Sequence, residues 1–201
     1  MRWILDDGAN LRLGDRQQEL TTIGVDSVAE HEHRMRDAVE ITPEPLTGTV
    51  AMALIEALNA ELLTRYPEPG ATHFTLDPAE VAPGNGIFIV ARLNGRPVGC
   101  GALRRIREPA LVRELGAKVG ELKRMYVAPD VRGRRIGQAI VDRLEAEARA
   151  LGLTRLVLET GTRQGEALAL YQRAGFTAMP LYGEYVASSG TSVCLEKRLR
   201  T

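Results

Sequence analysis

One stretch of this 201-residue chain decides the fold, and it reads ELKRMYVAPDVRGRRIG from Glu121 to Gly137. An apolar run ends at a Pro129-Asp130 turn, after which an arginine- and glycine-rich loop opens a long amphipathic pattern. A strand, a glycine loop and a helix N-terminus in that order bind anions, because the loop amides and the helix dipole point at the ligand. The expected ligand is a pyrophosphate, which narrows the function to a few cofactor-using classes.

Length and composition are typical of one soluble globular domain with an appendage. Hydrophobic residues make up 44% of the chain and charged residues 26%. No apolar run approaches the roughly 20 residues that span a bilayer, and the start MRWILDD does not read as a signal peptide. These features predict a cytoplasmic protein with no membrane partner. The absence of a long basic stripe and of a nucleic-acid-binding motif predicts no nucleic-acid partner.

Charge divides the chain into two parts. Residues 1–44 hold ten acidic and five basic residues, whereas residues 45–201 hold sixteen and twenty-one. Basic charge can steer an anionic ligand toward its cleft. We interpret residues 1–37 as an N-terminal extension, with a hairpin over 3–13 and a short helix over 27–36. Three roles are possible for this extension. It packs on the domain, it contacts a second protomer in a homodimer, or it is a flexible tail.

Neither a metal site nor a disulfide is expected. Cys100 and Cys194 lie in apolar, strand-like segments, which favours buried free thiols. The run His31–His33 resembles a metal site only in isolation, because adjacent residues on a helix point to different sides. A solvated polar face is the better interpretation.

The rest of the chain alternates strand and helix patterns. Asn94-Gly95 between two apolar runs predicts a hairpin. The expected strands are 38–42, 87–92, 97–103, 120–127, 155–159, 176–179 and 192–197. The expected helices are 47–66 or 49–66, 136–151 and 165–174, with a short helix or a loop at 110–115. The first helix is expected to turn four apolar residues inward, namely Met52, Ile55, Leu58 and Leu62. This order predicts a mixed α/β fold, with an antiparallel meander first and helix crossovers after it.

Three motifs resemble those of the GNAT-type (GCN5-related) N-acetyltransferase superfamily, in that superfamily's order. The segment Arg132–Gly137 resembles its acetyl-CoA loop, (Gln/Arg)-x-x-Gly-x-(Gly/Ala), and Leu158–Thr160 matches the strand that follows. Ala167–Phe176, ALALYQRAGF, resembles its last helix and turn. The resemblance assigns residues 38–201 to a GNAT-type acetyltransferase domain. It implies a central mixed, mostly antiparallel sheet flanked by helices.

The resemblance also implies acetyl-CoA as cosubstrate and no metal. In the fold that is resembled, a splayed strand holds the pantetheine arm and the thioester carbonyl, and the loop binds the pyrophosphate. The cofactor-binding residues implied are Met125, Tyr126, Val127, Arg132, Gly133, Arg134, Arg135, Ile136, Gly137 and Gln138. Two positions depart from the family's pattern, since Arg135 replaces a loop glycine and Gln164 replaces an asparagine. Either Arg135 takes a backbone conformation that a side chain tolerates, or the loop shifts.

Two residues fall where the family places its acid and its base. Tyr171 is a phenol of ordinary pKa about 10, which can protonate a departing thiolate. The alternative for Tyr171 is a core residue on a helix face. Glu121 can take a proton from the acceptor ammonium, directly or through water. Its alternative role is an ion pair with Lys123 or Arg124, and Glu159 or water alone are rival bases.

The leading hypothesis is acetyl transfer from acetyl-CoA to a primary amine, small or amino-acid-like, by direct attack in a ternary complex. The alternative is a non-catalytic acyl-CoA-binding regulatory module that acts through a protein partner. Intact Glu121 and Tyr171 favour the enzyme. A nucleotide enzyme of the P-loop or dinucleotide type is excluded, because neither glycine motif occurs. The identity of the acceptor stays open. A polar loop is expected to border the acceptor, with Tyr182, Tyr185, Ser188, Ser189 and Ser192.

Overall fold

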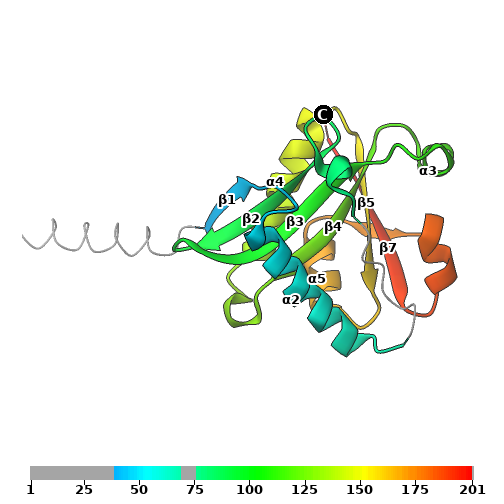
Figure 1. Cartoon of the computed structure of the whole chain (residues 1–201). Coiled ribbons are helices and arrows are strands. Elements are labelled where there is room, and N and C mark those ends of the chain that lie inside the picture. Colours follow the sequence, from blue (N-terminus) through cyan, green and yellow to red (C-terminus); the bar gives the residue numbers. More distant parts are fainter. Residues whose placement is uncertain (1–38, 69–75, 201) are drawn as a thin grey trace, which may run out of the picture. The chain divides into compact units, whose positions relative to one another are not determined.

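The computed structural model describes residues 39–68 and 76–200, which form one mixed sheet with helices on both faces (Figure 1). The elements in chain order are β1 (Val39–Pro43), α2 (Thr49–Arg65), η1 (Pro78–Val81), β2 (Gly86–Leu93), β3 (Arg96–Arg105), α3 (Pro109–Leu115), β4 (Val119–Val127), η2 (Pro129–Val131), α4 (Ile136–Ala150), β5 (Arg155–Gly161), α5 (Gly165–Arg173), β6 (Thr177–Met179), η3 (Gly183–Ser188) and β7 (Ser192–Arg198). The hairpin and helix predicted within residues 1–37 lie outside the described residues. The start of the domain at residue 38 stays a prediction.

The sheet has the order β1-β2-β3-β4-β5-β7-β6. All its neighbouring strands pair antiparallel except β4 and β5, which pair in parallel across the α4 crossover. The predicted mixed, mostly antiparallel sheet is thus confirmed. The turn between β2 and β3 has φ 52° at Asn94 and 76° at Gly95. Positive φ angles at both central residues are what a two-residue hairpin turn of type I′ requires.

Each face of the sheet is covered by its own helices. Helices α4 and α5 share the largest core cluster, to which α4 contributes Ile140 and Leu144 and β4 contributes Leu122. The opposite face carries α2 and η1 over β2 and β3, and α3 and η3 over β4, β5 and β7. Alternate residues of β4 therefore point to different layers. Leu122 faces α4, while Glu121 faces η3.

Of the four residues of α2 predicted to point inward, Leu58 is buried and Ile55 packs on a core cluster, but the prediction for Met52 is wrong. The buried residues of α2 are Ala51, Leu54 and Leu58, whereas Met52 is 59% exposed. Helix α2 carries apolar residues almost all the way round, so a periodicity argument does not select the face that packs. The turns η1 and η3 were not predicted either, because single turns of this type have no distinct apolar period.

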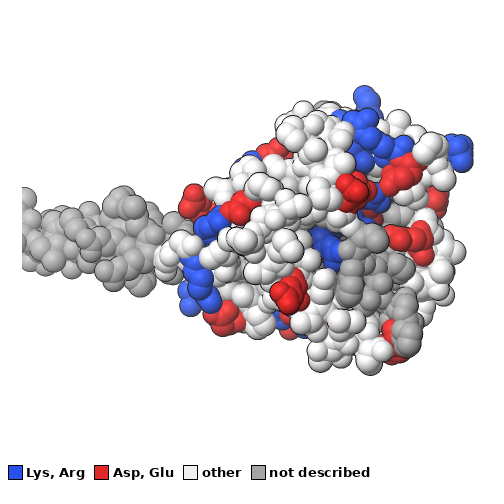
Figure 2. All heavy atoms as spheres, viewed as in Figure 1, with Lys and Arg blue, Asp and Glu red and all other residues white. Residues whose placement is uncertain are grey.

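The two cysteines are buried free thiols, as predicted. Burial raises the pKa of Cys100 to about 12 and that of Cys194 to about 11. In the described part of the chain no three side chains of metal-binding type gather. No described helix is both long and apolar enough to cross a bilayer. The face drawn in Figure 2 mixes basic and acidic side chains rather than showing a continuous basic stripe.

Candidate active site

The site begins where β4 and β5 separate. Their parallel pairing runs from Val119 with Arg155 to Leu122 with Leu158 and then stops. Beyond that point β4 pairs with β3 and β5 with β7, as far as the described residues show. The β5-facing backbone edge of residues 123–127 is therefore unpaired in the sheet. An extended ligand can hydrogen-bond to such an edge.

A β-bulge lies in the same half of β4. The register with β3 shifts between Cys100 and Ala102, and Arg124 has φ 58°. Two residues of β4, Arg124 and Met125, oppose a single residue of β3 here. An extra residue bends the strand and increases its twist. The bulge thus occurs at the point where β4 leaves β5, and it re-aims the side chains that follow.

The loop 132–135 leads into α4 through two left-handed residues. Gly133 has φ 83°, and Arg135 has φ 61° and ψ 13° as the N-cap of α4. Of the two expected outcomes at the substituted glycine, the structure has the first: Arg135 adopts the left-handed conformation. No side chain caps α4, and the Gln138 amide instead donates to Asp142 Oδ1 at 2.9 Å. Uncapped amides at a helix start are what a phosphate oxygen accepts from.

The loop arginines differ in their surroundings. Arg132 Nε donates to the Val127 carbonyl at 3.0 Å, and its guanidinium pairs with Glu61 at 2.6 Å and Glu166 at 3.5 Å. Arg132 therefore ties the loop to β4, α2 and α5. Arg134 and Arg135 are both exposed, on the loop that leads into α4.

Gly137 has a packing role that the sequence did not indicate. A Cβ at this position would lie 3.0 Å from a methyl group of Leu170. The missing side chain lets α5 approach the first turn of α4, and α5 carries Tyr171. A substitution of Gly137 would therefore disturb both the loop and the position of Tyr171.

Tyr171 is buried between α5 and the sheet. It is 4% exposed, and its ring meets that of Phe176 edge-on with the centroids 5.8 Å apart. None of the described residues hydrogen-bonds to its hydroxyl. Burial, and then the charge of Glu159, raise the pKa of Tyr171 well above its ordinary value. The phenol is therefore a proton donor throughout the neutral range.

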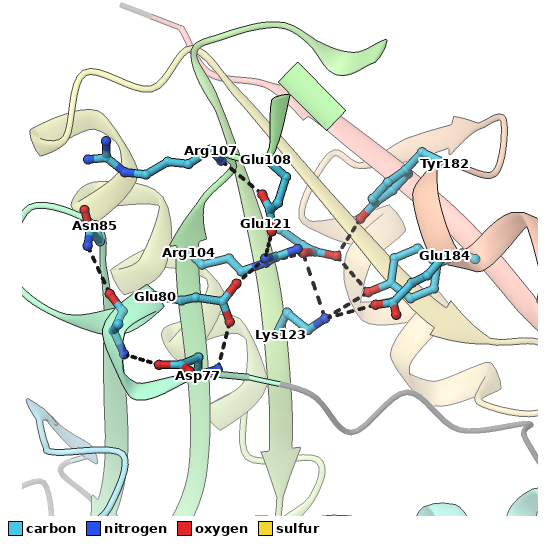
Figure 3. Close-up of polar contacts among 12 residues, drawn as sticks. Asp77, Glu80, Asn85, Arg104, Arg107, Glu108, Glu121, Lys123, Tyr182 and Glu184 are labelled. Carbon is cyan, nitrogen blue, oxygen red and sulfur yellow. Dashed lines mark hydrogen bonds and ion pairs between the residues drawn. The ribbon is translucent and has the colours of Figure 1, made fainter. Parts of the chain in front are cut away.

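Glu121 lies at the centre of a buried polar cluster on the other face (Figure 3). Its side chain is only 1% exposed. Arg104 Nε donates to Glu121 Oε2 at 2.6 Å, and the hydroxyls of Tyr182 and Tyr185 both donate to Oε1 at 2.8 Å. Lys123 Nζ lies 4.0 Å from Oε2. The predicted ion pair of Glu121 with Lys123 is thus present, and Arg104, which the sequence did not suggest, is a closer partner because it stands opposite Glu121 on β3.

The cluster is electrostatically coupled. Burial opposes the charge on Arg104, but Glu121 and Glu80 raise its pKa above the ordinary value. Burial, together with the negative charge of Glu121, raises the pKa of Tyr182 and Tyr185 well above the ordinary value. The two phenols are consequently held as neutral hydrogen-bond donors to a buried carboxylate.

The loop expected at the acceptor forms η3 and the start of β7. Tyr182 and Tyr185 are buried against Glu121, and Ser192 is buried at the start of β7, whereas Ser189 is exposed. The structure thus brings two of the predicted loop residues to the predicted base. Glu159 acts electrostatically on both Tyr171 and Tyr185, so it lies near both parts of the site.

A separate hollow of about 630 Å³ lies at the opposite end of α4 from the loop. Its basic residues are Arg149, Arg173, Lys197, Arg198 and Arg200. The first two lie in the last turns of α4 and α5, where a cation offsets the partial negative charge of the helix end. This hollow shares no residue with the site described above.

The chain belongs to the GNAT family of acetyltransferases, whose family model matches residues 52–176. Among its relatives, an IAA acetyltransferase from Azospirillum brasilense is 38% identical over 161 residues, which cover 80% of this chain and 98% of that protein. A mycothiol acetyltransferase from Beutenbergia cavernae is 32% identical over 130 residues, covering 64% of this chain and 42% of that protein. The protein is therefore an N-acetyltransferase.

Solved structures give the same fold. An acyl-CoA N-acyltransferase from Klebsiella pneumoniae is 33% identical with a TM-score of 0.65, and the match covers 81% of this chain and 98% of that one. A GNAT family acetyltransferase from Elizabethkingia anophelis, solved with acetyl-CoA bound, is 18% identical with a TM-score of 0.54, covering 80% and 98%. The predicted family and fold are both confirmed.

Proposed function

We propose that this enzyme transfers the acetyl group of acetyl-CoA to a primary amine of a small or amino-acid-like acceptor, by direct attack in a ternary complex. One observation carries the proposal: β4 separates from β5 beside the uncapped start of α4. The unpaired strand edge can align an extended thioester arm, and the helix start can hold its pyrophosphate. The cofactor-binding residues are those that the sequence predicts, from Met125 to Val127 and from Arg132 to Gln138.

Tyr171 is the proposed general acid. Its hydroxyl has no hydrogen-bond partner among the described residues, and its raised pKa keeps the proton on the oxygen. As the amine nitrogen bonds to the acetyl carbon, the carbon–sulfur bond breaks and the Tyr171 proton passes to the sulfur. Bulk solvent then reprotonates the phenolate. A positioned acid of this kind contributes typically about a hundredfold or more to the rate.

Glu121 is the proposed general base. It lies on the same strand as the proposed thioester site, on the face that carries the η3 loop. Its carboxylate is fully buried, so a proton from the acceptor ammonium reaches it through hydrogen-bonded groups rather than by direct contact. Glu159 and water alone are the rival bases. With either of them as the base, a substitution of Glu121 would not impair proton removal from the acceptor.

A panel of amines tests the function. Purified enzyme, acetyl-CoA and each amine are mixed, free thiol is followed with time, and mass spectrometry identifies the acetylated product. The panel includes amino acids, their amides and decarboxylated forms, polyamines, and IAA because of the relative's name. Catalytic thiol release with a matching acetylated amine supports the proposal. Stoichiometric CoA binding without turnover on any amine supports the regulatory module instead.

The homodimer, the cytoplasmic location and the lack of a nucleic-acid partner remain predictions from the sequence. Light scattering of the purified enzyme, with and without CoA, measures the mass of the assembly. A mass of one chain, 22.0 kDa, would exclude the homodimer under those conditions.

A further inference from the structure

The burial of Glu121 poses a question of proton access. Its side chain is 1% exposed, and both oxygens already accept hydrogen bonds from Arg104, Tyr182 and Tyr185. No acceptor amine can touch this carboxylate without displacing one of them. If Glu121 is the base, one of its partners carries the proton to it.

Two polar routes lead from Glu121 toward the surface (Figure 3). The first runs through Arg104 to Glu80 and Glu108, whose side chains are 29% and 46% exposed. A guanidinium keeps its protons in proteins, so this route cannot pass one on. Arg104 therefore holds the carboxylate in place and balances its charge.

The second route runs through Tyr185. Lys123 Nζ donates to the Tyr185 hydroxyl at 3.1 Å and lies 3.8 Å from Glu184, whose side chain is 48% exposed. The Tyr185 hydroxyl in turn donates to Glu121 Oε1 at 2.8 Å. A hydroxyl that accepts from a cationic N–H and donates to a carboxylate has the polarity that proton transfer toward the carboxylate requires.

Tyr182 makes the same 2.8 Å hydrogen bond to the same oxygen. Its side chain is 1% exposed, and Glu121 is the one described residue that hydrogen-bonds to its hydroxyl. The two rings pack edge-on with centroids 5.1 Å apart, so they share a single environment. Of the two phenols, Tyr185 has a second described partner, Lys123, which connects it to the half-exposed Glu184.

We propose that Tyr185 is the proton relay between the acceptor ammonium and Glu121, and that Tyr182 only positions the carboxylate. The inference rests on the proposed function, in which Glu121 is the base. An N–H bond of the acceptor ammonium breaks and an O–H bond forms at Tyr185, while the original Tyr185 proton moves to Glu121 Oε1. The amine and Tyr185 end neutral, and Glu121 ends as a carboxylic acid. The same route returns its proton to solvent.

The raised pKa of Tyr185 fits this role, because the phenol stays protonated and can pass a proton only by receiving another. Several charged or titratable groups face the cluster and set its pH response. They are Arg104 on β3, Lys123 and Arg124 on β4, Glu159 on β5, Tyr182 just before η3, Glu184 on η3, and Cys194 on β7.

The test compares kcat/KM against pH for wild type, Tyr185→Phe, Tyr182→Phe and Glu121→Gln, on an amine from the panel above. Tyr182→Phe is the matched control, since it removes an equally long hydrogen bond from the same oxygen. Tyr185→Phe is expected to lose at least about tenfold at pH values where the acceptor is protonated, and to recover as the amine becomes neutral. Tyr182→Phe is expected to show a smaller loss that is the same at every pH. The double variant Glu121→Gln/Tyr185→Phe is expected to be no slower than Glu121→Gln.

Parallel profiles for the two phenylalanine variants would overturn the relay, as would additive losses in the double variant. If Glu121→Gln has the wild-type profile, the base assignment fails and the relay with it. If only Glu121→Gln loses activity on the acidic side, the base stands and the relay fails.

Melting temperature and CoA affinity establish that each variant is folded. If Tyr185→Phe does not fold, Lys123→Met replaces it, because it removes the N–H that holds the Tyr185 hydroxyl in its donating orientation toward Glu121 while leaving both phenols. An acid-side loss in Lys123→Met supports the relay, and an unchanged profile rejects it.

Discussion

Replacing Tyr171 with phenylalanine should lower the activity without lowering the stability. The ring is buried and packs on Phe176, and phenylalanine keeps that packing. The lost hydroxyl has no hydrogen-bond partner among the described residues. A buried hydroxyl without a partner costs about 1–3 kcal/mol in mutational data, and that of Tyr171 is not fully enclosed. We therefore expect Tyr171→Phe to leave stability unchanged or to raise it by about 1 kcal/mol.

The activity should fall steeply. Loss of a general acid is expected to lower kcat by about a hundredfold or more, which corresponds to about 2.7 kcal/mol of transition-state stabilisation. The affinity for CoA should change little, because the cofactor is held by the loop and the strand edge. For a chain of this size, a gain of about 1 kcal/mol raises Tm by about 2–4 °C.

Tyr66→Phe is the matched control. Tyr66 is also buried, at 3% exposed, but its hydroxyl accepts a hydrogen bond from the Arg163 amide at 2.6 Å. Its removal should lower stability by about 1 kcal/mol. Tm, calorimetric CoA affinity and kcat are measured for both variants. Wild-type kcat in Tyr171→Phe would refute the acid role, and a clear fall in its Tm would show that the hydroxyl has a structural partner.

Three further predictions concern the loop, the thiols and alkaline stability. Arg135→Gly should stabilise the fold by about 1 kcal/mol, because a residue with a side chain costs about 1–2 kcal/mol in the left-handed region. The control Arg135→Ala should not stabilise it. A lower Tm in Arg135→Gly would contradict the left-handed conformation of Arg135 at the start of α4. Cys100 and Cys194 should resist a thiol reagent at pH 8 in the native state and react in denaturant, because burial raises both pKa values; fast native reaction would show that a thiol is accessible. Burial raises the pKa values of three tyrosines, Tyr171, Tyr182 and Tyr185. The unfolded chain therefore loses these protons at a lower pH than the folded chain, and the stability should fall as pH rises above about 10. A Tm that does not change between pH 9 and about 11 would contradict the burial of these phenols.

The sequence predicts most elements of this fold because they depend on local signals. The Asn94-Gly95 turn needs two positive φ angles, and only a few residue types supply them readily. Helix α4 has a clear apolar stripe, and its burial follows that stripe. Helix α2 lacks such a contrast, so Met52 was assigned to the wrong side. Where one face of the pattern is distinct, sequence and structure agree.

The site is predictable to the same degree. The loop motif locates the start of α4 because glycines and a helix onset are local features. The partner of Glu121 is not local, since Arg104 reaches it across the register of β3 and β4. Lys123, one of the two partners that the sequence predicts, does lie 4.0 Å from the carboxylate, but Arg104 is closer and forms the hydrogen bond. The register is set by the whole sheet.

The bulge at Arg124 joins these observations. In a regular strand, side chains would alternate between the α4 face and the η3 face all along β4. The extra residue breaks that alternation between Lys123, which faces Tyr185, and Met125, which packs on the α4 side. Glu121 and Lys123 are therefore fixed by the regular part of the sheet, while Met125 to Val127 belong to the part that leaves β5. Glu121 and Lys123 thus lie on the regular part of β4, and the proposed cofactor-binding edge lies on the part that bends away from β5. The bulge at Arg124 separates the two parts.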